Sequence, residues 1–179
     1  VAAGVTAPSI ERWVRGQPAL VRVMPNTPAL VGAGISALYA NENVDKDQRR
    51  LAETIMSAVG KTVWIQDESL MDTVTAVSGS GPAYFFYVMQ AINDAAVSGG
   101  LDLETARLLT LETALGAARL ALESAEDPGT LQKRVTSPGG TTEAAINVLD
   151  SSGVSDAFQN AVSAAHARGS DLAKLLDKD

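Results

Sequence analysis

The stretch LDLETARLLTLETALGAARLALE, residues 101–123, decides the fold because it reads as one long helix without a polar face. Gly99 and Gly100 precede it, and Asp102 is placed to cap its start. Leucine recurs on more than one of its faces, at Leu103, Leu108, Leu109, Leu111, Leu115, Leu120 and Leu122. Such a helix must be buried nearly all round. A domain of about 110 residues rarely buries one helix that fully alone, so we predict a helical domain that pairs with a second copy.

Around this helix the chain changes character once. Before residue 67 it alternates: strand 1–5, helix 6–14 with Thr6 as N-cap, strands 19–25 and 34–40, helix 45–59 stopped by Gly60, and strand 61–65. From Glu68 onward only helical patterns appear, at 68–77, 81–98, 102–125, 129–135, 141–151 and 155–176. The fold class expected is therefore the back part of a layered α/β domain (1–66), followed by an all-α domain (67–179).

The amino-acid composition argues against several kinds of partner and site. The 179 residues are 46% hydrophobic and 4% aromatic, with a formal net charge of -7, which argues against a nucleic-acid or anionic-membrane partner. There is no cysteine, and the single histidine, His166, cannot build a metal site alone. We therefore expect no metal site. Charged residues interrupt the most apolar helix, so we expect no membrane span, and a cytoplasmic location is the default. The chain begins VAAGV without a methionine, which we interpret as the later part of a longer protein.

One helix start carries more polar groups than a cap needs. In TSPGGTTEAAINVL, residues 136–149, Ser137 and Thr141 can cap, and Glu143 belongs in the first turn. The backbone N–H groups from Gly139 to Thr142 would form a concavity for a carboxylate or phosphate. The alternative is an ordinary capped helix after a Pro-Gly turn. The excess of hydroxyls favours the anion site.

Two further stretches are candidates. In RVMPNTPA, residues 22–29, Asn26 and Thr27 follow a strand end, where α/β sheets bind ligands, although a plain Asx turn is the simpler interpretation. In SGSGPAYFF, residues 78–86, Gly79 and Gly81 lack the third glycine of a dinucleotide loop and are interpreted as a packing hinge. No isolated pair of carboxylates suggests general acid/base catalysis.

Together these stretches resemble a known family. The segments AAGV, RVMPNTPA, SGSGPAYFF and TSPGGTTEAAINVLDSSGV resemble, in order and spacing, those of pyrroline-5-carboxylate reductases, and the last looks like the family signature. The resemblance implies the C-terminal part of a Rossmann-type NAD(P)-binding domain (1–66) and an all-helical dimerisation domain (67–179). It also implies a homodimer, often assembled further into a decamer, whose active site lies where domains and subunits meet.

The resemblance further implies a reaction and its residues. The reaction is reduction of the C=N bond of 1-pyrroline-5-carboxylate to L-proline by hydride from NADPH or NADH, the last step of proline biosynthesis. The residues matching the loop for the substrate carboxylate are Ser137, Gly139, Gly140, Thr141 and Thr142. Thr142 matches the threonine proposed to hydrogen-bond the ring nitrogen. The residues matching segments near the nicotinamide are Ala2, Ala3, Met24, Pro25 and Asn26.

The sequence departs from the family pattern in one respect, and two other interpretations of its function stay open. The family's glycine-rich pyrophosphate loop is not in this sequence, so we expect the chain by itself to be inactive. A related hydroxy-acid dehydrogenase of similar plan would carry a catalytic lysine on the first long helix of its second domain, and GPAYFFYVMQAINDA has none. The other alternative is a helical dimerisation module without catalysis, in which TSPGGTT is a plain cap.

Overall fold

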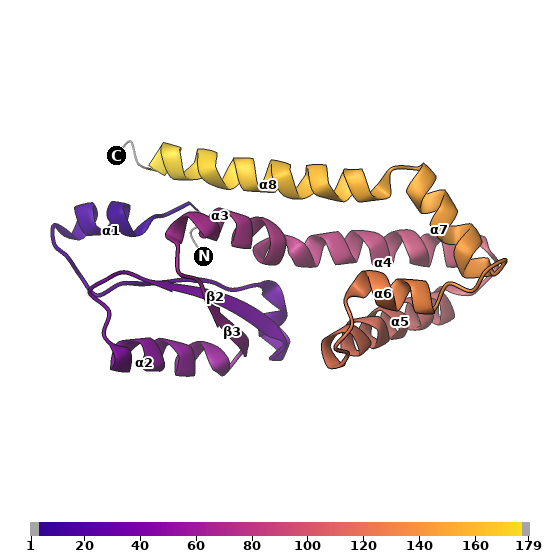
Figure 1. Cartoon of the computed structure of the whole chain (residues 1–179), viewed down its shortest axis with the longest axis horizontal. Coiled ribbons are helices and arrows are strands. Elements are labelled where there is room, and N and C mark those ends of the chain that lie inside the picture. The colour runs from indigo at the N-terminus through magenta and orange to yellow at the C-terminus, as the bar shows by residue number, and fades with distance from the viewer. Residues whose placement is uncertain (1–3, 177–179) are drawn as a thin grey trace. The chain divides into compact units, whose positions relative to one another are not determined.

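The computed structural model describes residues 4–176, and its contacts divide the chain into two compact units. The first unit contains the residues up to Ala83 together with those from Asn160 onward, and the second contains Tyr84–Gln159. An α/β part is followed by helices (Figure 1), as the sequence predicts. The domain division after residue 66 stays a prediction, since compactness divides the chain elsewhere.

The first unit is built on a sheet of three strands: β1 (Val21–Met24), β2 (Gly34–Ala40) and β3 (Gly60–Trp64). Their order is β1-β2-β3, with β1 and β2 antiparallel and β2 and β3 parallel. Leu38 on the central strand faces Val23 on one side and Trp64 on the other in the register, and its side chain is fully buried. The core of this unit is therefore centred on β2.

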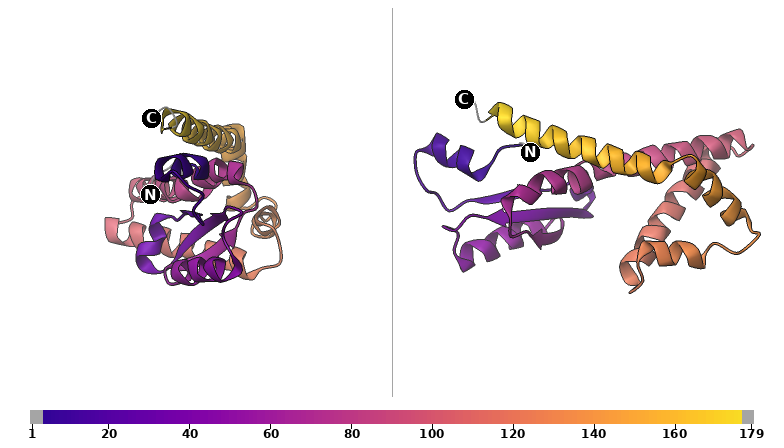
Figure 2. Two further views of the ribbon diagram at one scale, coloured as in Figure 1. Left: turned by 90° about the vertical axis from the view of Figure 1, so that its left-hand side faces the viewer. Right: turned by 45° about the horizontal axis from the view of Figure 1, so that its top comes forward.

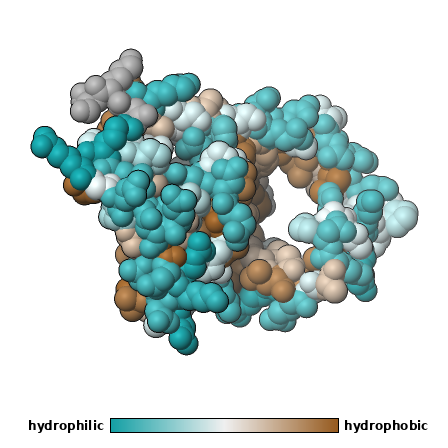
Figure 3. Space-filling model, turned by 60° about the vertical axis from the view of Figure 1, so that its left-hand side comes forward, coloured by the Kyte–Doolittle hydropathy of each residue, from teal (hydrophilic) through white to brown (hydrophobic). Residues whose placement is uncertain are grey.

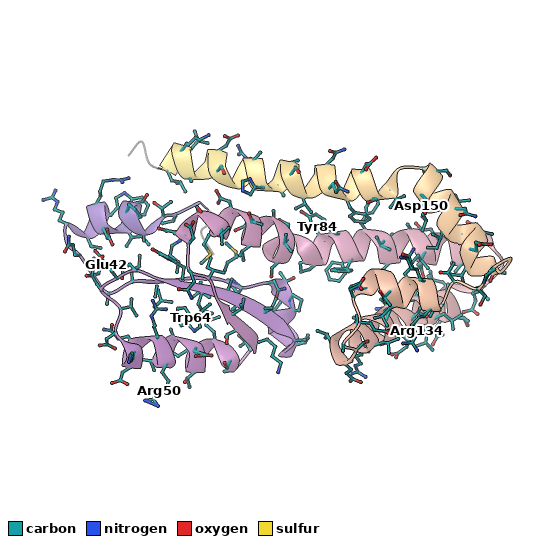
Figure 4. The ribbon with its side chains drawn as sticks, in the orientation of Figure 1. Glu42, Arg50, Trp64, Tyr84, Arg134 and Asp150 are labelled. Carbon is teal, nitrogen blue, oxygen red and sulfur yellow. The ribbon has the colours of Figure 1, made fainter. Side chains whose placement is uncertain are left out.

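Helices cover both faces of this sheet. α1 (Ala7–Val14) and α3 (Met71–Val74) lie over one face and α2 (Lys46–Ser57) over the other (Figures 1 and 2). Trp64 lies between the sheet and α2 (Figure 4), with the Arg49 guanidinium 5.1 Å from its ring centre. The result is a layered α/β unit, as expected.

Local sequence signals fix where several of these elements begin. Two predictions about their bounds are wrong. Thr6 caps α1 by accepting the Ser9 N–H at 3.2 Å, as predicted. The strand predicted at 1–5 is wrong in its described part, because Gly4 has a φ of 85°, which an extended strand does not contain, and no strand includes Val5. α2 ends at Ser57, before the predicted stop. Gly60 opens β3 instead, where a Cβ would lie 1.9 Å from the Gly34 carbonyl oxygen.

After β3 the chain turns through three short helical pieces where one helix was predicted. They are the 3-10 helix η2 (Glu68–Leu70), α3, and the π-helix η3 (Thr75–Gly79). The Glu68 carboxylate accepts the Ala7 N–H at 2.6 Å and pairs with Arg22 at 2.5 Å, so it ties the start of this segment to α1 and β1. Both side chains of the ion pair are largely buried.

The second unit consists of helices. It holds most of α4 (Gly81–Ser98), α5 (Leu103–Glu123), α6 (Pro128–Arg134), α7 (Thr141–Ser151) and the start of α8 (Val154–Leu176). The predicted helices match these within two residues at each end. Asp102 caps α5 as expected, because it accepts the Thr105 N–H at 3.0 Å.

Burial in the second unit is sparse. Among its described residues only Ala106 and Thr110 are buried, whereas the leucines of α5 are 40–85% exposed. Hydrophobic side chains accordingly reach the surface among hydrophilic ones (Figure 3). Even so, no helix within residues 4–176 is both long enough and apolar enough to cross a membrane.

Candidate functional site

The first unit has a groove beside the end of β1. Its volume is about 490 Å³. It brings together two stretches that are far apart in the sequence, the one after β1 and the π-helical segment before α4. The lining residues are Met24, Pro25, Asn26, Thr27, Ala29, Leu30, Thr75, Gly79 and Ser80.

The first wall of the groove is shaped by the turn after β1. Pro25 has no N–H with which to continue the strand ladder, and the chain enters the 3-10 helix η1 (Thr27–Val31). The Asn26 carbonyl accepts the Ala29 N–H at 3.1 Å, and its side-chain oxygen accepts the Ile35 N–H at 3.0 Å. The oxygen of Asn26 therefore anchors β2, while its side-chain NH₂ group has no hydrogen bond among the described residues.

The second wall is the π-helix η3. A Cβ on Gly79 would lie 3.4 Å from the Met24 sulfur, which is ordinary van der Waals contact, so this glycine lies against the end of β1. The Thr75 hydroxyl donates to the Met71 carbonyl at 2.8 Å, and the Thr75 carbonyl accepts the Ser80 N–H at 2.8 Å. The predicted packing hinge stays a prediction at Gly79, and close packing is not found at Gly81, where nothing lies within 4 Å of a built Cβ. Wide turns of this kind are frequent at functional sites.

The second unit contains the TSPGGTT loop, which forms a tight turn. The Gly140 N–H donates to the Ser137 carbonyl at 3.0 Å, with Pro138 and Gly139 between them. Gly139 has a φ of 72°, and proline followed by a glycine of positive φ is the sequence signature of a type II turn. A Cβ on Gly140 would lie 2.9 Å from the Ser137 oxygen, so glycine is required there for a different reason.

The start of α7 has no side-chain cap. Its N-cap is Gly140, so the predicted caps Ser137 and Thr141 are wrong: Ser137 lies too early, and Thr141 is already the first helical residue. Thr136 is not available either, because its hydroxyl donates to the Gln132 carbonyl at 2.7 Å. An ordinary capped helix, which was the simpler alternative, is therefore not what the loop forms.

The donors at this helix start differ from those expected. Of the four predicted N–H groups, that of Gly140 is bonded to Ser137 and that of Gly139 donates to the Glu143 carboxylate at 2.8 Å. The N–H groups of Thr141, Thr142 and Glu143 have no hydrogen bond within residues 4–176, as expected for a first turn without a cap. The hydroxyls of Ser137, Thr141 and Thr142 are also without partners there. This part of the loop can accept an anion.

The arginine that precedes the loop forms an ion pair with a carboxylate. Arg134, at the end of α6 (Figure 4), bonds the Glu126 carboxylate at 2.7 Å, and this hydrogen bond raises the pKa of Arg134. The free donors of the loop are neutral N–H and O–H groups, with Thr142 half-buried and Thr141 exposed. Within the described chain no three His, Asp or Glu side chains gather as a metal site requires.

The predicted site residues thus fall into three groups. Met24, Pro25 and Asn26 line the groove of the first unit, and Ser137, Gly139–Thr142 form the loop of the second. Ala2 and Ala3 lie outside the described residues. Thr75 and Ser80, which also line the groove, were not predicted. The signal in the sequence was Gly79, which stands beside Ser80 and lies against Met24 at the end of β1.

Comparison with known proteins gives a consistent result. Residues 68–172 match the family described as pyrroline-5-carboxylate reductase dimerisation. The pyrroline-5-carboxylate reductase of Pseudomonas aeruginosa is 52% identical over 98% of this chain and 64% of its own length. That of Synechocystis is 47% identical over 93% of this chain and 62% of its own length.

Solved structures agree. A pyrroline-5-carboxylate reductase from Coxiella burnetii superposes with a TM-score of 0.90 at 51% identity, covering 95% of this chain and 63% of that one. Pyrroline carboxylate reductase from Plasmodium falciparum, solved with NADP bound, gives a TM-score of 0.90 at 32% identity, covering 96% and 65%. The chain therefore spans a little under two thirds of the length of these relatives.

Proposed function

We propose that this chain, which belongs to the pyrroline-5-carboxylate reductase family, is the part of such an enzyme that holds the substrate and the nicotinamide end of its cofactor. The reaction is reduction of the C=N bond of 1-pyrroline-5-carboxylate to L-proline, with NADPH or NADH as the hydride donor. The cofactor supplies the hydride when it is bound. The residues of this chain would bind and orient the two reactants.

The observation that carries the proposal is the uncapped start of α7. The substrate is a small anion, and Thr141, Thr142 and Glu143 offer three N–H groups at the positive end of a helix. The hydroxyls of Ser137 and Thr141 add donors that no cap consumes. Gly139 and Gly140 contribute through the turn, because their own N–H groups are bonded within the loop.

Thr142 is proposed as the catalytic residue. With the substrate carboxylate on the N–H groups beside it, the Thr142 hydroxyl would donate a hydrogen bond to the ring nitrogen. Hydride addition to the imine carbon would raise the electron density on the nitrogen, and a hydrogen-bond donor at that atom stabilises this change; the proton that completes the amine would come from water. A neutral hydroxyl serves this purpose, which fits the absence of a carboxylate pair in the sequence.

The groove of the first unit is proposed for the nicotinamide. Met24 and Pro25 offer apolar contact, and the unpaired NH₂ group of Asn26 can donate to a carboxamide. Thr75 and Ser80 add hydroxyls on the facing wall. The bound NADP of the Plasmodium relative supports a nicotinamide cofactor for this chain too.

The assembly proposed is a homodimer through the helical unit. The exposed leucines of α5 and the family description of residues 68–172 both support it. Assembly of dimers into a decamer is a part of the proposal that rests on the family resemblance. A cytoplasmic location is a further part, which rests on the composition of the chain.

The test uses a protein of the full length of the relatives, of which this chain spans a little under two thirds. Loss of NADPH or NADH absorbance that depends on pyrroline-5-carboxylate would establish the reaction. Replacing Thr142 by Val should then lower kcat/KM on the order of 10²-fold, as for loss of one hydrogen-bond donor placed at developing charge. Thr142→Ser, which keeps the hydroxyl, should stay close to the parent.

Other outcomes would redirect the proposal. Equal kcat/KM for Thr142→Val and the parent would remove Thr142 from the mechanism. No consumption of NADPH or NADH with the imine, but reduction of NADP+ or NAD+ by a hydroxy acid, would favour the related dehydrogenase. Neither reaction would leave a helical dimerisation module.

A further inference from the structure

We propose that Glu143 is a positioning residue that holds the TSPGGTT loop in its binding conformation while leaving the first N–H groups of α7 free for the substrate. The inference rests on the proposed function, because it assigns how that same loop is kept open. It concerns a side chain that need not touch the substrate.

The chain contains its own reference for what a complete cap does. At the start of α2, the Asp45 carboxylate accepts the Gln48 N–H at 2.8 Å, and the Gln48 side chain accepts the Asp45 N–H at 3.0 Å. This reciprocal pair is a capping box. It fixes the helix start, and it also uses an N–H group of the first turn.

At α7 only the reverse half of this arrangement is present. Glu143 holds the position of Gln48, three residues after the N-cap, but the N-cap is Gly140 and has no side chain. The Gly140 N–H is already bonded to Ser137, so the Glu143 carboxylate reaches one residue further back, to the Gly139 N–H. The loop is thus tied to the helix without any first-turn N–H being used.

Little else holds the turn in place. Nothing lies within 4 Å of a Cβ built on Gly139, and the three atoms nearest to one on Gly140 all belong to Ser137 inside the same turn. Ser137, Pro138 and Gly139 are exposed, whereas Glu143 is half-buried. Among the described residues, the bond to Glu143 is the one side-chain hydrogen bond found for Gly139, a residue whose positive φ defines the turn.

The experiment compares three variants of the full-length parent enzyme. Glu143→Ala removes the acceptor, and the KM for pyrroline-5-carboxylate should rise on the order of five- to tenfold, as for one lost hydrogen bond of typical net strength, with kcat within about twofold of the parent. Glu143→Gln keeps an acceptor oxygen and should restore a KM close to the parent value. Glu104→Ala removes a carboxylate from the first turn of α5, and should leave KM unchanged.

Amide hydrogen exchange gives a readout independent of turnover. The Gly139 amide should exchange faster in Glu143→Ala than in the parent and should stay protected in Glu143→Gln. An active parent whose Glu143→Ala variant keeps the parent KM would overturn this inference alone. So would a Glu143→Gln variant as impaired as Glu143→Ala, because charge rather than the acceptor would then matter. A parent that consumes no cofactor would overturn the proposed function and this inference with it.

Discussion

The two units of the molecule bury their hydrophobic side chains in opposite ways. In the first unit the sheet and its helices enclose a core of their own, with Leu38, Ala76 and Ala37 almost inaccessible. In the second, five helical segments bury only Ala106 and Thr110 among the described residues, while Leu122, Leu103 and Phe85 are each more than 60% exposed. The sheet of the first unit has helices on both faces and a buried centre, although Leu30 and Leu51 at its surface are exposed, whereas the helices of the second unit present apolar faces that nothing described in this chain covers.

The difference teaches what each unit needs from a partner. Exposed apolar surface on this scale is typical of chains that associate. The stability of the second unit should therefore depend on protein concentration, and that of the first should depend mainly on its own packing.

The largest expected effect is the loss of dimerisation when leucines of the second unit are replaced. Replacing Leu111 and Leu115, one turn apart on α5, by Glu should weaken dimerisation by on the order of 10²-fold or more, because burying each leucine contributes roughly 1.5–3 kcal/mol. Sedimentation at micromolar concentration would show monomer, and thermal unfolding would lose its concentration dependence. Leu51→Glu, at an exposed leucine of α2, is the matched control and should leave the dimer intact. A parent protein that is already monomeric would refute the dimer proposal.

A smaller effect separates stability from binding within the second unit. Gly139 and Gly153 have φ values of 72° and 68°, and neither has an atom within 4 Å of a built Cβ. Alanine at either position should cost a similar 1–2 kcal/mol or so of unfolding free energy, since the strain is the same. Only Gly139→Ala should also raise the KM for pyrroline-5-carboxylate. Equal KM values for the two variants would mean that the turn does not shape the site.

The smallest expected effect is on how the melting temperature falls at acidic pH. The pKa of Asp102 is lowered because its carboxylate accepts the Thr105 N–H, and that of Asp127 because it accepts the Thr130 hydroxyl and N–H. A folded pKa below the unfolded one contributes stability that is complete above the ordinary carboxyl range, and that is lost as the pH falls through the folded value. Asp102→Asn should therefore flatten the pH dependence of the melting temperature between about pH 6 and 3.

Both capping carboxylates belong to the second unit, and the control is Asp156 in the first turn of α8, for which no hydrogen bond is found in the described chain. Asp156→Asn should leave the slope with pH closer to that of the parent. A slope unchanged in Asp102→Asn would show that this cap does not contribute to the acid response.

Much of this arrangement was predictable from sequence because its causes are local. Thr6, Asp45 and Asp102 stand before helices whose starts they fix, and the sequence therefore located those starts. Periodicity also identified the helices from residue 81 onward. The predicted strand at 1–5 was wrong in its described part, because whether a short apolar run pairs depends on a neighbour that local sequence does not specify.

The site was predictable in its location and less so in its detail. The hydroxyls and glycines of TSPGGTT marked the loop, but the sequence placed caps on Ser137 and Thr141 where the structure has Gly140. The choice of cap depends on the turn made by Pro138 and Gly139, which shifts the helix start. The walls of the groove meet through a contact between Gly79 and Met24, residues 55 apart, and no local pattern encodes such a meeting.

The discontinuous build of the first unit has a consequence for biosynthesis. Gly4 can pass close to the backbone of Ala173 only because it lacks a side chain, and Asp72 accepts the Ser170 hydroxyl at 2.8 Å. These contacts join a segment made early on the ribosome to one made after the intervening helices have been translated. At about 5–20 residues per second, the first unit waits several seconds for the last helix to complete it. During that interval the surface of the first unit that α8 later covers is exposed to solvent.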